Sequence, residues 1–338
     1  MNTAAASIAV ANTGCKQFEF LTDSSPKDRP WDDHRRWADK MAAALDAAGM
    51  NKEAARVRDC ANALFFRLAV ADDTGEITFK LRSAPFCHWR HCPVCQWRRS
   101  LKSKGIVMSA LPAILAQYPN ARFAMLTLTV RNCSVSDLRQ TILAMNKGWK
   151  RLLLRDEWPA LGWIRAVEVT RGEDGSAHPH FHALLMLPPG YFGRKYLSTR
   201  AWVRLWRESM RLDYDPVCDV RMVRAKVPTA PDSAAPVTAL RSSVAEVVKY
   251  ATKAADLLAG GPDWLAEYAA QVRGLKFLTS GGVLKGVLKA CESKDEDLVH
   301  IRDESEAGDE DAREKLRFDW RRKHGRYARK KKAAVSTD

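Results

Sequence analysis

Apolar and polar residues follow two periods along this chain, one typical of helices and one typical of strands. A helical pattern extends from Trp31 to Leu68. It breaks at Gly49, and a second helix is expected from Lys52. Residues 76–82 alternate polar and apolar side chains, as a short strand does, and lead into a group of cysteines. The pattern therefore predicts a small helical unit followed by one strand and a cysteine segment.

The rest of the chain alternates predicted strands and helices. The expected strands are 122–131, 163–170, 180–187 and 217–224, and the expected helices are 134–154, 198–212 and 237–259. The turn-forming sequence Arg-Gly-Glu-Asp-Gly-Ser at 171–176 joins the second and third strands, so we expect them to form an antiparallel hairpin. This order predicts an α+β fold, with helices packed over a central, mostly antiparallel sheet.

Composition and charge narrow the class of protein. Hydrophobic residues make up 46% of the chain and charged residues 28%, which excludes a mostly disordered chain. Lys and Arg total 55 against 40 acidic residues, and the net charge of +15 favours polyanionic partners, nucleic acid first. No apolar run is long enough for a membrane helix. Residues 2–15 lack the pattern of a secretory signal, so we expect a cytoplasmic protein without disulfides.

Three of the eight cysteines fall within nine residues, in the sequence Cys-His-Trp-Arg-His-Cys-Pro-Val-Cys that begins at Cys87. In a reducing compartment such clustering favours a structural Zn²⁺ with four protein ligands. The candidate ligands are Cys60, Cys87, Cys92 and Cys95, with His88 and His91 as alternatives to Cys60. A group of free, half-buried thiols is the less favoured alternative.

The sequence His-Pro-His-Phe-His at 178–182 suggests a second metal site. Alternate side chains of a strand share a face, so His180 and His182 point the same way, about 6 to 7 Å apart at the backbone. They can then bind one divalent ion. Glu168 on the preceding strand is the expected third ligand, and His178 is its rival. Histidines that only fill the core or the surface are the alternative.

A third group of polar residues lies in the predicted helix 237–259. At helical spacing, Glu246, Tyr250 and Lys253 lie within about one turn of each other, opposite an apolar face. A phenol, a carboxylate and an ammonium together suit nucleophilic attack on phosphorus. Tyrosine has an ordinary pKa near 10, so it needs help from a cation such as Lys253 or from the metal. Taken alone, the segment favours an ordinary amphipathic helix with a polar surface.

The cysteine, histidine and tyrosine motifs, taken in their order along the chain, resemble those of a known family. This family is the plasmid rolling-circle replication initiators that carry an HUH endonuclease domain of the single-tyrosine type. Met-Leu-Thr-Leu-Thr at 125–129 is similar to the first strand motif, 178–182 to the metal motif and 246–253 to the nucleophile motif. The cysteine segment, with Cys60 upstream, resembles the one that precedes the domain in these proteins. The resemblance covers about residues 55–290.

The resemblance implies an HUH fold with a ferredoxin-like or RRM-like sheet, and a Mg²⁺ or Mn²⁺ ion held by His180, His182 and a third ligand. It implies that Tyr250 attacks single-stranded or hairpin DNA at a plasmid origin, leaving a 5′-phosphotyrosine link and a 3′-OH that a host polymerase extends. Glu246 occupies the position at which relatives activate water to end the cycle. No helicase P-loop occurs in the sequence, so a host helicase in the bacterial cytoplasm is expected to separate the strands.

The expected organisation has four parts. These are a flexible leader at 1–30, a helical and zinc-binding module at 31–105, the HUH domain at 106–290 and a charged, acidic-then-basic tail at 291–338. Two other functions stay open. One is a noncatalytic zinc-containing DNA-binding or regulatory protein, and the other is a relaxase or transposase that uses the same chemistry.

Overall fold

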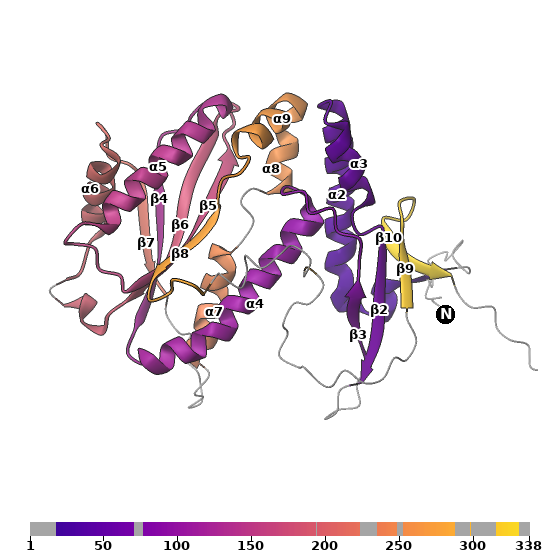
Figure 1. Cartoon of the computed structure of the whole chain (residues 1–338), viewed down its shortest axis with the longest axis horizontal. Helices are drawn as coiled ribbons and strands as arrows, with labels where there is room; N and C mark the ends of the chain where they lie inside the picture. Colours follow the sequence, from indigo (N-terminus) through magenta and orange to yellow (C-terminus); the bar gives the residue numbers. More distant parts are fainter. Residues whose placement is uncertain are drawn as a thin grey trace, which may run out of the picture.

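The computed structural model of the chain describes residues 18–70, 77–193, 195–223, 235–248, 253–287, 298 and 316–330. Its strands form two antiparallel sheets in two lobes, and the long helix α4 (Pro93–Gln117) runs between them (Figure 1). Buried side chains from both sheets belong to one continuous hydrophobic cluster. The expected α+β class and a mostly antiparallel sheet are confirmed, but the sheet that joins Phe18–Phe20 to residues 316–330 was not predicted from the sequence.

The first sheet joins the two ends of the described chain. Its strands, in spatial order, are β1 (Phe18–Phe20), β10 (Arg326–Lys330), β9 (Leu316–Arg321), β2 (Ala63–Val70) and β3 (Ile77–Ser83). Its helices are α1 (Leu21–Ser24), the 3-10 turn η1 (Pro26–Asp28), α2 (Arg29–Ala47) and α3 (Asn51–Asp59). The ring of Phe318 lies 6.0 Å from that of Phe66 and 6.1 Å from that of Phe79. These rings pack strands from both ends of the chain together.

Three expectations about this lobe are wrong. Residues 18–28 of the expected flexible leader fold as β1, α1 and η1, and residues 316–330 of the expected charged tail form the β9–β10 hairpin. The many charged residues of 316–330 suggest a solvated tail, but this segment also contains apolar residues that are buried, among them Phe318 and Tyr327. The helical pattern of the sequence extends to Leu68, but α3 ends at Asp59 and β2 begins at Ala63.

The second sheet carries the histidine motif on its central strand. Its strands, in spatial order, are β7 (Cys218–Met222), β4 (Arg122–Thr129), β6 (Ala177–Leu187), β5 (Gly162–Arg171) and β8 (Leu278–Gly282). The hairpin of β5 and β6 confirms the expected antiparallel pairing. Around the sheet lie η2 (Val135–Asp137), α5 (Leu138–Leu153), η3 (Pro189–Phe192), α6 (Thr199–Met210) and α7 (Ala235–Val247). None of the described helices combines the length and the apolar composition that a bilayer crossing requires.

The two faces of β6 pack against different helices. On one face Phe181 is fully buried, with its ring 6.1 Å from that of Trp149 in α5 and 6.0 Å from that of Trp206 in α6. The other face carries His180, His182 and, further along the strand, Leu184. Leu184 belongs to a buried cluster with residues of two helices, which are Val244 and Val247 of α7 and Val107 and Leu111 of α4. Helices α4 and α7 therefore cover the histidine face of the sheet.

The single helix expected at 237–259 is interrupted. The described elements in this region are α7, α8 (Ala254–Ala259) and α9 (Gly261–Gln271). Lys253 has an extended backbone with φ −68° and ψ 141°, so it is not on the same helix as Glu246. The β-branched pair Val247-Val248, where α7 ends, is a weak helix former. The Gly-Gly-Pro sequence at 260–262 directly follows the end of α8 and also begins α9, because proline suits a first helical turn.

The buried ring of Phe318 allows a test of whether the C-terminal hairpin belongs to the fold. Replacing Phe318 by alanine leaves a cavity between three strands, and we expect the free energy of unfolding to fall by about 3 to 5 kcal/mol. Urea denaturation followed by circular dichroism measures the change. Lys330→Ala, at an exposed position of β10, is the control and should change stability by less than about 0.5 kcal/mol. Equal stability of both variants would contradict the packing described.

Candidate active site and cysteine cluster

The pairing of β5 with β6 brings three metal-binding side chains onto one face of the sheet. Glu168 lies directly opposite His180, and Ala166 lies opposite His182. One carboxylate oxygen of Glu168 is 2.9 Å from Nε2 of His182 and 3.4 Å from Nε2 of His180. The three potential ligand atoms lie within 4.8 Å of one another, so the group could hold a metal ion. We call these three residues the metal triad.

The electrostatics of the metal triad favour a bound cation. Glu168 and His180 are only 9% and 8% exposed. Burial raises the pKa of the Glu168 carboxyl, but hydrogen bonds from His180 and His182 and their positive charges lower it more, so its pKa lies well below the usual range. The triad therefore offers an ionised carboxylate and two imidazoles, which is a donor set for a divalent ion.

A second layer of contacts fixes the orientation of the two imidazoles. Nδ1 of His182 lies 3.1 Å from the hydroxyl of Thr127, which is opposite it on β4. Nδ1 of His180 lies 3.3 Å from the carbonyl oxygen of His178. Both rings then present Nε2 to the triad, as metal-binding histidines commonly do when their other nitrogen is held. The role of Thr127 was missed from the sequence, although its motif was recognised.

His178, the rival third ligand, lies outside the metal triad. Its Nδ1 is 2.5 Å from Oδ1 of Asn132, and its ring is partly exposed. Burial, together with the charge of His180, lowers its pKa. The geometry among the described residues therefore brings Glu168, and not His178, to the histidine pair.

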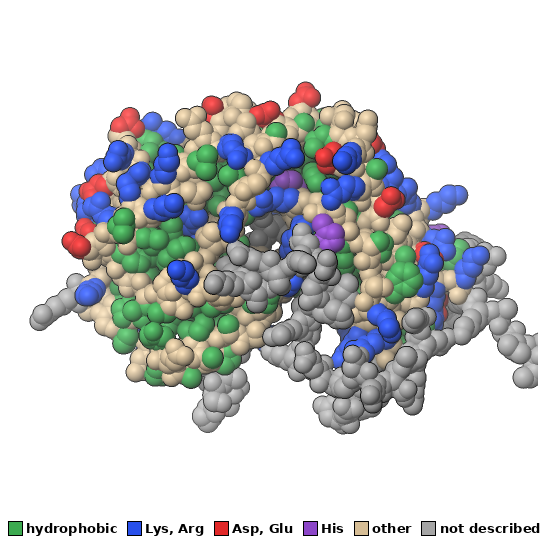
Figure 2. Space-filling view, in the orientation of Figure 1, with side chains coloured by type: hydrophobic (Ala, Val, Ile, Leu, Met, Phe, Trp, Pro, Cys, Tyr) green, Lys and Arg blue, Asp and Glu red, His purple; other side chains and the backbone are tan. Residues whose placement is uncertain are grey.

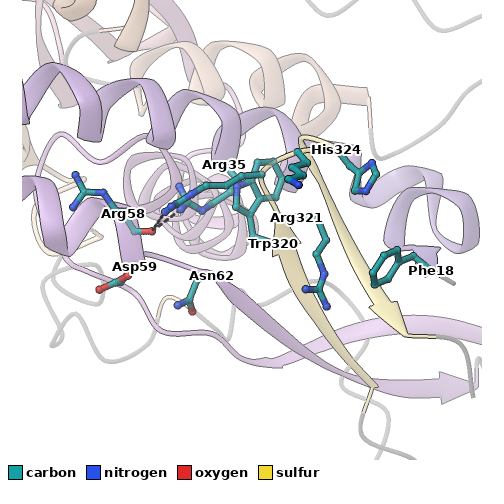
Figure 3. Close-up of a pocket in the computed structure, with 10 residues that line it drawn as sticks. Phe18, Arg35, Arg58, Asp59, Asn62, Trp320, Arg321 and His324 are labelled. Carbon is teal, nitrogen blue, oxygen red and sulfur yellow. Dashed lines mark hydrogen bonds between the residues drawn. The ribbon is translucent and has the colours of Figure 1, made fainter. Parts of the chain in front are cut away.

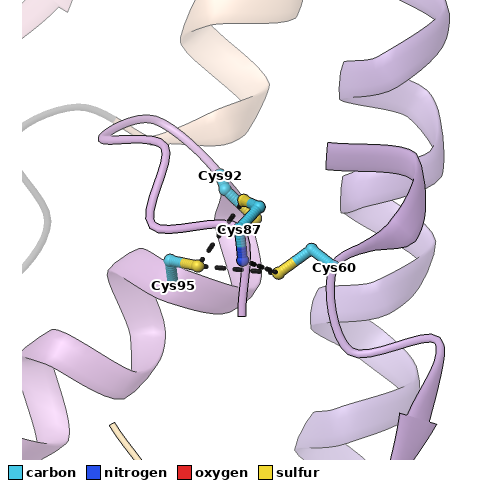
Figure 4. Close-up of side chains that lie close together, drawn as sticks. All are labelled: Cys60, Cys87, Cys92 and Cys95. Carbon is cyan, nitrogen blue, oxygen red and sulfur yellow. Dashed lines mark hydrogen bonds between the residues drawn. The ribbon is translucent and has the colours of Figure 1, made fainter. Parts of the chain in front are cut away.

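The four candidate zinc ligands converge at the junction of α3 and α4 (Figure 4). Cys60 ends α3, Cys92 precedes α4 as its N-cap, and Cys95 lies in the first turn of α4. The Sγ atom of Cys95 is 3.5 Å from that of Cys60 and 3.7 Å from that of Cys87. Thiolates around tetrahedral zinc, with Zn–S bonds near 2.3 Å, lie about 3.8 Å apart. The cluster could therefore hold a metal ion of this kind.

The histidines near this cluster make other contacts. His91 is 3% exposed, and its ring lies 5.2 Å from that of Tyr268 and 5.1 Å from that of Trp89. Burial lowers the pKa of His91 to about 3, so the ring is neutral. His91 therefore packs against α9, and Cys60 is the fourth member of the sulfur group.

Contacts of the cysteine segment and α9 reach the metal triad's hairpin. The guanidinium of Arg90 lies over the ring of Phe277, 4.3 Å from its centroid. The carbonyl of Phe277 accepts a 2.8 Å hydrogen bond from the backbone N–H of Val167, the residue before Glu168. Trp264 of α9 donates through Nε1 to the carbonyl of Gly175, in the turn between β5 and β6, at 2.9 Å. The two candidate metal sites are therefore connected through packed side chains.

The predicted nucleophile segment is described only in part. Glu246 is exposed in the last turn of α7, and Lys253 is exposed just before α8. Tyr250 lies outside the described residues. The structure therefore brings the three residues of the metal triad together at one site and the four cysteines together at another. The expected Tyr250 site lies partly outside the described residues.

Comparison with known proteins identifies the family. Residues 78–328 match the family model of the replication proteins, Rep_1. The "Protein rep" of Lactiplantibacillus plantarum is 34% identical over 306 residues, covering 85% of this chain and 90% of the relative. Proteins of the same name from Lentilactobacillus hilgardii and Bacillus amyloliquefaciens are each 31% identical, over 85% and 86% of this chain and 91% of each relative. No solved structure matches the chain. The chain therefore belongs to the Rep_1 family of replication proteins, the plasmid rolling-circle replication initiators.

Proposed function

We propose that this initiator nicks one strand of a plasmid origin by metal-dependent transesterification, with Tyr250 as the nucleophile. The observation that carries the proposal is the metal triad, a buried carboxylate and two oriented imidazoles on the central strands of the sheet. The basic charge of the chain supports a DNA substrate. Figure 2 shows Lys and Arg side chains over both lobes on this face of the molecule.

The ions that we propose for the metal triad are Mg²⁺ or Mn²⁺, as the resemblance to the HUH initiators implies; the carboxylate suits these ions, while the imidazoles also suit other divalent metals. Such an ion supplies Lewis-acid chemistry, offsetting the negative charge that grows on the scissile phosphate. Glu168 is ionised at neutral pH, since burial raises its pKa but contacts with the two imidazoles lower it more, below an ordinary value that is already acidic. Thr127 and the backbone of His178 keep Nε2 of each imidazole turned toward Glu168, where the ion would be held.

The proposed reaction exchanges one phosphodiester for another. The phenol of Tyr250 loses its proton and its oxygen bonds to phosphorus while the bond to the 3′ oxygen breaks. That oxygen takes up a proton in turn and becomes a free 3′-OH. The DNA 5′ end stays on the tyrosine, so the strand can be rejoined without another energy source. In support, α7 packs on the histidine face, and Tyr250 follows the buried Val248 by two residues in the sequence.

We assign the two flanking charged residues supporting roles in this proposal. Glu246 would accept a proton from water, or from a second nucleophile, to end the cycle. Lys253 would stabilise the phenolate of Tyr250 when it forms. Both side chains are exposed and can approach a bound strand. A host helicase and a host polymerase in the bacterial cytoplasm would separate and copy the strands.

A covalent adduct tests the proposed nucleophile directly. Wild-type protein mixed with single-stranded origin DNA and Mn²⁺ should give a protein–DNA band that survives denaturation, and chelation should abolish it. Tyr250→Phe removes the attacking oxygen, so no adduct should form while DNA binding is kept. Tyr196→Phe, which removes the same oxygen from a side chain that is 56% exposed, is the matched control and should react normally. An undiminished adduct with Tyr250→Phe would refute the assignment.

The third metal ligand can be identified by titration with Mn²⁺. Because Glu168 touches both imidazoles, Glu168→Gln should weaken Mn²⁺ binding by at least about tenfold, the loss typical of a disturbed metal shell. His178→Ala should bind Mn²⁺ as the wild type does. Electron paramagnetic resonance of free Mn²⁺ gives the affinities, and the opposite ranking of the two variants would make His178 the ligand.

We also propose that the four cysteines hold one structural Zn²⁺. Elemental analysis of protein purified without chelator should find one zinc per chain. Cys60→Ser should lose most of this zinc and melt at a lower temperature, because the tie between α3 and α4 is lost. Cys133→Ser, which lies outside the cluster, should keep both the zinc content and the melting temperature of the wild type. Wild-type protein that contains no zinc would refute the proposal.

A further inference from the structure

A pocket of about 440 Å³ lies in the first lobe, between the β9–β10 hairpin and residues of α2 and α3 (Figure 3). Of the ten residues that line it, five are Arg or Lys and one is Asp. Those used below are Arg35, Arg58, Trp320, Arg322, Lys323 and His324. The volume is within the range of pockets that hold small ligands. We call this site the basic pocket.

Aspartates balance only part of the positive charge. Asp39 lies 3.0 Å from a terminal nitrogen of Arg35 and 3.5 Å from Nε of Arg322, and Asp46 pairs with Arg58. A guanidinium has five donor hydrogens, so one carboxylate leaves others available. Arg322 is 57% exposed, and Lys323 has no carboxylate partner among the described residues. The basic pocket can therefore bind an anion.

Aromatic rings lie beside these charges. The guanidinium of Arg35 is 5.6 Å from the ring centroid of Trp320 and is fully buried. Trp320 itself is partly exposed, and its Nε1 donates to Asp39 at 2.7 Å, which holds the indole in place. The ring of His324 lies 6.2 Å from that of Phe18. Cations next to fixed aromatic rings are the groups that bind the phosphates and bases of unpaired strands.

The basic turn of the hairpin is held in one position before any ligand binds. Arg36 of α2 donates to the carbonyl of Gly325 at 2.7 Å. The ring of His324 lies 5.6 Å from that of Phe20 in β1. Gly325 has φ +58°, a conformation that permits the tight turn after Arg322 and Lys323. Because these contacts already fix the backbone of the turn, ligand binding costs the entropy of its side chains but little of its backbone.

We propose that the basic pocket binds one unpaired nucleotide of the origin strand, separately from the metal triad. The phosphate lies on Arg322, Lys323 and Arg58, and the base lies against Trp320. The pocket belongs to the first sheet and the triad to the second, so a strand bound in the pocket would contact a lobe other than the one that carries the triad. The inference rests on the DNA binding of the proposed function but does not require the chemistry of Tyr250.

The test uses the double variant Arg322→Ala/Lys323→Ala, which changes two exposed turn residues. Fluorescence anisotropy measures the binding of a long single strand of the origin and of a short strand that covers only the nick. Affinity for the long strand should fall about tenfold. The slope of log K against log salt concentration should become shallower by about one to two, which is about one for each lost phosphate contact. Affinity for the short strand and the melting temperature should be unchanged.

The matched control is Lys147→Ala/Lys150→Ala, which removes the same charge from exposed positions of α5. This control should keep the affinity for the long strand. An equal loss in both double variants would overturn the proposal, because the effect would then be one of general charge. An unchanged affinity of the Arg322/Lys323 variant would overturn it as well.

Two competitors identify the ligand. Single-stranded DNA of unrelated sequence should displace the long strand from the pocket, whereas a free mononucleotide at the same nucleotide concentration should not. Displacement by the mononucleotide would overturn the assignment to a DNA strand. Adduct formation on the short strand is scored separately, so a failure of the nicking chemistry is distinguished from a failure of the basic pocket.

Discussion

The register of the β5–β6 hairpin is the constraint on which the site depends. It sets Glu168 opposite His180 and leaves His182 two positions along the same face, within reach of the same carboxylate. A slip of one residue would turn Glu168 to the opposite face, which α5 and α6 cover. The register is held at the turn by Trp264 and beside Glu168 by the backbone of Phe277. Contacts from distant parts of the sequence therefore maintain a geometry that looks local.

The cysteine cluster contributes to this geometry from the first lobe. It joins the end of α3 to the start of α4, the helix that runs between the lobes. Through Arg90 and His91 the same segment packs on Phe277 and Tyr268, next to the second sheet. A structural metal there would fix the direction in which α4 leaves the first lobe, and with it the surface that covers the histidine face.

Short-range patterns in the sequence predicted the site better than the fold. Alternation along two adjacent strands was enough to place Glu168, His180 and His182 on one face, because a hairpin needs only local pairing. The first sheet was missed because β9 and β10 lie far from β1, β2 and β3 in the sequence. These two strands also carry many charges, which mask their buried residues Leu316, Phe318, Tyr327 and Ala328. The basic pocket could not be predicted, since it forms only where this hairpin meets α2 and α3.

The pairing of β1 with β10 has a consequence for the order of folding during synthesis. Phe18 pairs with Lys330, the last described residue, so the first sheet cannot be completed before Lys330 has left the ribosome. The second sheet lies between them in the sequence and can be complete earlier, because domains fold as they emerge. Until then β2 has an open edge on the side that β9 later occupies, and such edges promote association between chains. The first lobe can therefore close only after residues 316–330 have been synthesised.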